Sequence, residues 1–115
     1  MIVDVGIQNI VSLLASGTWE IAVGTGTNLP MADNLTLQTE YDRKDATATA
    51  ETTIIAGDTL QLDAEFVWGE DVSLTEVGVF EKTVGWMLLR EILPTVDVPT
   101  GETLPVTIQV PLKRV

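Results

Sequence analysis

The stretch that decides the fold class is residues 60–68, which read LQLDAEFVW. Every second side chain in it is apolar and would lie on one face of a β-strand, namely Leu60, Leu62, Ala64, Phe66 and Trp68. The side chains of Gln61, Asp63 and Glu65 would point the other way. This stretch therefore predicts a strand with one buried, apolar face and one solvent-exposed, polar face, as in an antiparallel sheet.

Outward from this strand, the same alternation recurs between turn residues. It predicts strands over residues 19–23, 75–81, 86–93 and 104–112, and a weaker strand or extended arm over residues 46–55. Five or six strands of near-even spacing favour an antiparallel β-sandwich.

Two breaks in this pattern carry specific expectations. Residues 82–85 suit a four-residue hairpin loop in which Gly85 takes a left-handed conformation. Pro105 and Pro111 cannot donate a backbone hydrogen bond to a neighbouring strand, so the last strand is expected at a sheet edge or at a bulge. An edge strand is a place where a second chain can join the sheet.

Residues 4–16 follow a period of three to four instead of two. The apolar residues Ile7, Ile10, Val11 and Leu14 form the stripe of an amphipathic helix. Three helical turns are marginal in water, so this stripe must pack on the rest of the domain or on a partner. Core packing is the expected use, and a subunit contact is the alternative.

The length of 115 residues has room for one domain with one core. Residues 1–115 are therefore predicted to form a single mainly β domain, an antiparallel β-sandwich with one short N-terminal helix at about residues 4–16. The first residues lack the basic segment of a signal peptide, and no apolar run approaches the ~20 residues that cross a bilayer. We expect the chain to be made in a cytoplasm.

The composition argues against several kinds of chemistry. The sequence contains no cysteine and no histidine, so it offers neither a thiolate nor an imidazole as nucleophile, base or metal ligand. With 17 acidic and 6 basic residues the formal net charge is -11, which repels phosphate backbones and anionic lipids. We therefore predict no catalytic residue, no cofactor and no metal, and neither nucleic acid nor a membrane as a partner.

Two features resemble sites only at first sight. Residues 24–27 read GTGT but lack the spacing and the lysine of a phosphate-binding loop, so their glycines are interpreted as turn residues with positive φ. Adjacent carboxylates such as Glu70 and Asp71 are unavoidable among so many acidic residues, and they are interpreted as solvated surface charge.

Arg90 is unusual because it lies inside the apolar strand predicted over residues 86–93. It is placed across the predicted hairpin from Glu76, and a structural ion pair between these two side chains is expected. The alternative is an arginine that binds a substrate carboxylate, and no pocket-forming motif supports it.

Several of these segments, taken in order, resemble a set of small structural proteins and fibre-attachment domains of tailed bacteriophages. They are GTGT at residues 24–27, then Leu37, Glu40 and Arg43, then Phe66 with Gly69, then Glu76-Val77-Gly78-Val79-Phe80, then Leu88-Leu89-Arg90. The ordered set covers nearly the whole chain and is more specific than any one of its segments.

This resemblance implies a non-enzymatic virion component that is assembled in the host cytoplasm. Since the sequence ends at Val115 without a fibre shaft, a capsid decoration (cement) protein on the capsid exterior is expected. The alternatives are a tail, collar or baseplate fibre-attachment protein, and a carbohydrate- or cell-surface-binding module. The last would need an exposed aromatic platform, whereas Trp19, Trp68 and Trp86 are expected in the core.

The expected partners are copies of the chain itself, a trimer being one option, and the phage major capsid protein or tail proteins. A subunit or capsid interface is expected on the helix stripe or on one face of the last strand. The candidate interface residues are Ile7, Ile10, Val11, Leu14, Val106, Ile108, Val110 and Leu112.

Overall fold

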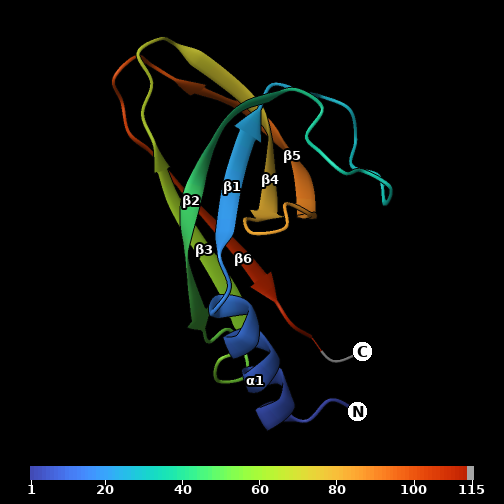
Figure 1. The fold of residues 1–115 in the computed structure, drawn as a ribbon. Coiled ribbons are helices and arrows are strands. Elements are labelled where there is room, and N and C mark those ends of the chain that lie inside the picture. The colour runs from blue at the N-terminus through green and yellow to red at the C-terminus, as the bar shows by residue number, and fades with distance from the viewer. Residues whose placement is uncertain (114–115) are drawn as a thin grey trace.

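The computed structural model describes residues 1–113, which form one helix and six strands (Figure 1). The elements are α1 (Asp4–Ala15), β1 (Trp19–Gly24), β2 (Glu40–Glu51), β3 (Thr59–Phe66), β4 (Val72–Glu81), β5 (Met87–Val98) and β6 (Leu104–Pro111). The molecule is elongated, with extents of 47 × 29 × 27 Å. Figure 1 shows α1 at one end and the long loop between β1 and β2 at the other.

The six strands of the described chain form one sheet in the order β5-β4-β1-β2-β3-β6, and all neighbours are antiparallel. β2 joins the two halves of this sheet, because it pairs with β1 up to Ala46 and with β3 from Thr47 onward. The sheet curls until it nearly closes. The predicted mainly β, antiparallel fold with an N-terminal helix is confirmed, and its two layers are halves of a single sheet.

The core lies between these two halves. All four apolar side chains that β3 turns inward are buried, namely Leu60, Leu62, Ala64 and Phe66. They belong to one cluster with inward side chains of β1 and β4, among them Ile21 and Val79. The alternation that predicted β3 from the sequence therefore builds the centre of the core.

α1 packs on β2 and β3 at one end of the core. Ile7 and Val11 are 0% and 1% exposed, and burial of each contributes about 1.5–3 kcal/mol. The indole N–H of Trp19 donates to the carbonyl oxygen of Leu14 at 2.8 Å, which ties the helix to the start of β1. The predicted helix is present, and the centre of its stripe is used within the chain.

β2 differs from its prediction, because it begins at Glu40 and ends at Glu51. Ile54 and Ile55 lie in a turn instead of a strand. The buried carboxylate of Asp58 causes this turn, since it accepts hydrogen bonds of 2.8–3.0 Å from the backbone N–H groups of residues 53–55. Those bonds, from Ile55 and Thr53 above all, hold the pKa of Asp58 well below its ordinary value.

The turn and edge predictions are confirmed. Gly85, in the loop between β4 and β5, has a φ of 96°, which is the left-handed conformation expected there. β6 lies at one end of the strand order, where Pro105 and Pro111 are tolerated. β5 lies at the other end, and its pairing with β4 shifts register around Pro94.

Candidate interaction sites

Four of the five motif segments of the sequence meet at one buried carboxylate, that of Glu76 on β4. Glu76 has no exposed surface. Its two oxygens accept hydrogen bonds from the backbone N–H groups of Gly26 (2.8 Å), Gln38 (2.9 Å) and Thr39 (2.8 Å). These donors come from both ends of the loop of residues 25–39, which joins β1 to β2. Glu76 therefore ties the two ends of this loop together.

Arg90 on β5 completes the cluster. Its Nε donates to Glu76 at 3.0 Å, so the ion pair expected from the sequence is present. Its two terminal nitrogens donate to the carbonyl oxygen of Asn28 (2.8 Å) and to Oδ1 of Asn34 (3.2 Å). Arg90 is only 7% exposed and all three of its nitrogens are engaged, so it holds the middle of the loop.

The surroundings of Glu76 favour its ionised form. Burial by itself would raise the pKa of Glu76, but the hydrogen bonds from Thr39, Gln38 and Gly26 and the contact with Arg90 outweigh burial and lower it. A general acid near neutral pH needs the opposite shift. The arrangement therefore serves to fix the backbone of the loop, which is the structural role predicted for the pair.

Two glycines of the GTGT segment allow the loop to approach Glu76 closely. A Cβ on Gly24 would lie 2.3 Å from the carbonyl oxygen of Thr39, and one on Gly26 would lie 2.5 Å from both Cβ of Gln38 and Oε2 of Glu76. Neither glycine has positive φ, so their interpretation as left-handed turn residues was wrong. Close packing of the backbone against the carboxylate is the reason for glycine here.

Further residues of two motif segments meet beside this cluster. Leu37 and Phe80 are buried together, and a Cβ on Gly78 would lie 2.8 Å from Cδ2 of Leu37. The guanidinium of Arg43 lies 3.8 Å from the centre of the Phe80 ring and forms an ion pair with Glu40 at 2.6 Å. Four of the five segments that carry the resemblance are thus parts of one structural unit around the base of the loop, whereas Phe66 of the fifth belongs to the main core.

The loop of residues 25–39 exposes apolar side chains while its base is buried. Leu29, Met31 and Leu35 are 77%, 67% and 81% exposed, and they line one hollow of the loop together with Arg90. Sequence periodicity did not single out these residues, because a loop has no regular period. The signal that could have found them is three large apolar residues in a segment between strands.

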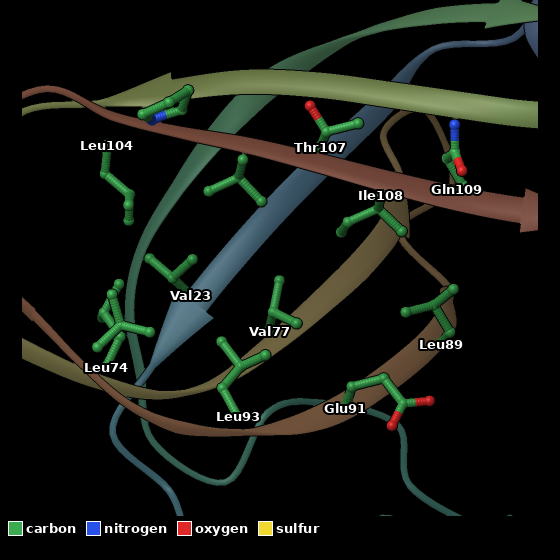
Figure 2. Close-up of a pocket in the computed structure, with 13 residues that line it drawn as sticks. Val23, Leu74, Val77, Leu89, Glu91, Leu93, Leu104, Thr107, Ile108 and Gln109 are labelled. Atoms are coloured by element: carbon green, nitrogen blue, oxygen red, sulfur yellow. The ribbon is translucent and has the colours of Figure 1, made fainter.

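A second surface feature is a groove between β5 and β6, where the sheet fails to close. Its volume is about 450 Å³, and Glu91 is the charged residue that lines it. Figure 2 shows Leu104 and Ile108 of β6 reaching toward Val77 of β4 and Leu93 of β5. Backbone addition to these edges is limited, because prolines interrupt both of them.

The residues expected at an interface occupy different environments in the structure. Ile7 and Val11 are buried in the core of the chain itself, whereas Ile10 is 39% exposed. Leu14, Val110 and Leu112 are half-buried against the same core, and Val106 and Ile108 line the groove. The structure therefore divides this set among the core, the groove and the outer face of α1.

The outer face of α1 is apolar as well. The exposed apolar residues of this face and of the segment before the helix are Met1, Ile2, Val3, Val5, Ile10 and Leu13. Residues 5–19 contain no charged side chain, although 20% of the chain is charged. A strip without charge is unusual on so acidic a protein and offers a contact surface, of which the stripe predicted from the sequence included only Ile10.

The three tryptophans differ in how deeply they are buried. Trp19 is 3% exposed, but Trp86 is 47% exposed and meets Trp19 edge to face at 5.6 Å, contrary to its predicted place in the core. Trp68 is partly buried, stacks on Phe66 and donates its indole N–H to Asp42 at 2.8 Å. Trp86 is therefore the most exposed of the three.

Within residues 1–113, no group of three or more acidic residues is arranged to hold a metal ion. The helix in that part of the chain is too short to span a membrane. No known protein family matches the sequence, and no curated protein is significantly similar to it.

Proposed function

We propose that the chain is a non-enzymatic structural protein of a tailed bacteriophage particle, a capsid decoration protein that binds the capsid exterior as a homo-oligomer. One observation carries this proposal: four of the five segments that resemble phage structural proteins, although far apart in sequence, meet around Glu76 and the base of one loop. These four segments are joined by the side-chain hydrogen bonds of Glu76 as well as by strand pairing, which supports the resemblance as one ordered pattern. The alternative is a tail, collar or baseplate attachment protein of the same architecture.

Counting the copies of the chain in purified particles separates these two roles. Quantitative mass spectrometry against an isotope-labelled standard of the purified chain should give hundreds of copies per particle for a decoration protein. A handful of copies would favour the tail, collar or baseplate role. If the chain were missing from intact particles, the virion proposal itself would be wrong.

Self-association is proposed to use the outer face of α1. Copies that each carry a formal charge of -11 repel one another, so a contact is favoured where charged side chains are absent. The strip of Val5, Ile10 and Leu13 meets that condition, and α1 lies at the end of the molecule away from the loop (Figure 1). An oligomer built at this end would leave the loops free to face the particle.

Sedimentation velocity tests the oligomer. The wild-type chain should sediment as an oligomer, and Leu13→Lys should shift it to the monomer, because the lysine would place a charge in the contact. Ile54→Lys is the matched control, since Ile54 is 78% exposed and Leu13 is 73% exposed. A wild-type monomer, or equal effects of the two substitutions, would refute the α1 contact.

A further inference from the structure

The loop of residues 25–39 has the properties of a rigid docking element. It is longer than most connections in compact domains, and long ordered loops are usually functional. Leu29, Met31 and Leu35 project from it with two thirds or more of their surfaces exposed. Large apolar side chains exposed together mark a surface that contacts another molecule.

The shape of this loop is fixed by its own hydrogen bonds as well as by Glu76 and Arg90. Oε1 of Gln38 accepts the N–H groups of Thr27 (2.9 Å) and Asn28 (2.8 Å). Oδ1 of Asn34 accepts the N–H of Met31 at 2.9 Å as well as the bond from Arg90. A loop that is ordered in advance loses little entropy when it binds, which increases its affinity for a partner.

The buried ion pair supports the same reading. A buried pair seldom stabilises a fold more than apolar residues of equal volume would, because both charges lose their hydration. Every side-chain hydrogen bond of Glu76 and Arg90, apart from the one between them, is to residues of the loop or its ends. Their specific contribution is therefore the position of the loop.

Charge selects the kind of partner. Asp33 is the one charged side chain among residues 27–39, and it is exposed. A second copy of the chain is a poor partner for the loop, because it is equally acidic and its apolar groove carries Glu91. A different protein whose apolar pocket is rimmed by lysine or arginine is complementary in both charge and polarity.

We propose that Leu29, Met31 and Leu35 insert into an apolar, basic-rimmed pocket on another protein of the particle. This inference rests on the proposed function, from which the particle is taken as the site of binding. It goes further in assigning the contact to one loop and in naming the chemistry of the surface that receives it.

Particles purified from phage that lack this chain are the probe, and they are titrated with the purified chain and sedimented. The combined variant Leu29→Ser, Met31→Ser and Leu35→Ser should bind about a hundredfold more weakly than wild type. The control combines Ile54→Ser and Val84→Ser, at positions that are 78% and 79% exposed, and it should bind as wild type does. Both variants should keep the wild-type unfolding midpoint, because the altered side chains are exposed.

The outcomes separate the two proposals. If wild-type protein fails to bind the particles, the proposed function is wrong. If it binds and the loop variant binds equally well, or the control loses as much affinity, the docking inference is wrong while the proposed function stands. A loop variant that keeps its affinity for particles but sediments as a smaller oligomer would make a second copy the occupant, which also overturns the inference.

The proposed basic rim of the pocket is tested by the salt dependence of binding. Raising the salt concentration should weaken wild-type binding, because salt screens the attraction between the acidic chain and a basic rim. Asp33→Asn should weaken binding severalfold at low salt and reduce its dependence on salt. Binding that is unaffected by both salt and Asp33→Asn would exclude the basic rim.

Discussion

The two ends of the molecule are held by different kinds of interaction. At the α1 end, Ile7 and Val11 are buried among apolar side chains. At the loop end, Glu76 and Arg90 bind backbone groups of the loop directly. β1 connects the two ends, since Trp19, its first residue, binds the helix and Gly24, its last residue, directly precedes the loop.

The difference shows what each interaction can specify. Burial of apolar area is non-directional, so it holds a helix that already has its own hydrogen bonds. A loop has backbone N–H and C=O groups without partners, and directional bonds to fixed acceptors and donors are needed to give it one shape. A network of charged side chains therefore holds the loop end, because burial of apolar side chains alone would not give the loop one fixed shape.

The largest expected effect comes from removing the acceptor at the loop end. Glu76→Ala leaves Arg90 buried without its partner and three backbone N–H groups without an acceptor, so the free energy of unfolding should fall by about 3–5 kcal/mol. Urea denaturation measures this loss. If Glu76→Ala cost less than ~1 kcal/mol, the network would not be holding the loop.

A somewhat smaller loss is expected at the helix end. Ile7→Ala removes a side chain with no exposed surface and should cost about 2–5 kcal/mol by leaving a cavity. Ile10→Ala on the outer face of the same helix is the control and should cost much less in a monomeric background such as Leu13→Lys. Hydrogen exchange should show fraying of α1 in Ile7→Ala while the amides of the loop keep their protection. If α1 and the loop lost protection together, the two ends of the molecule would not be held independently.

The glycines at the base of the loop give a smaller effect. Gly26→Ala places a Cβ 2.5 Å from Glu76 and from Gln38, so the loop must shift, at a cost of about 1–3 kcal/mol. Gly69→Ala is the matched control, because its Cβ would meet no atom within 4 Å and its φ is not positive. Thermal unfolding of the two variants should separate them clearly, and equal midpoints would show that the backbone at Gly26 has room.

Acid should weaken the loop end selectively. The pKa of Glu76 is lower in the folded chain than in the unfolded chain, so its contribution to stability is present above the unfolded pKa, about 4.3, and is lost as the pH falls through the folded value. The difference in stability between wild type and Glu76→Gln should therefore shrink as the pH is lowered below about 4. Denaturation curves at a series of pH values measure it, and a constant difference would mean that Glu76 is not ionised in the fold.

The sequence predicted the parts of the fold that repeat with a regular period. α1, β3 and the edge position of β6 followed from apolar spacing and from prolines, and the pairing of Glu76 with Arg90 followed from a charge inside an apolar strand. The start of β2 at Glu40 could not be predicted in this way, because the polar residues of its first half show no alternation in hydrophobicity.

The loop shows why the rest could not be predicted. Its shape depends on hydrogen bonds between residues far apart in sequence, such as Gly26 with Glu76 and Asn28 with Arg90. No local pattern encodes such pairs. The same holds for the groove, which exists because two strands adjacent in sequence, β5 and β6, lie at opposite edges of the sheet and do not pair.

The smallest expected effect tests whether burial decides how much an ion pair contributes to the stability of this chain. Lys82 pairs with Asp45 at 2.8 Å, a shorter contact than the 3.0 Å between Arg90 and Glu76, but its side chain is 46% exposed. Water already solvates both of its charges, so Lys82→Ala should leave the thermal unfolding midpoint unchanged, whereas Arg90→Ala, which leaves Glu76 buried without its partner, should lower it by about 10 °C or more. Equal shifts would mean that burial does not decide how much an ion pair contributes to the stability of this chain.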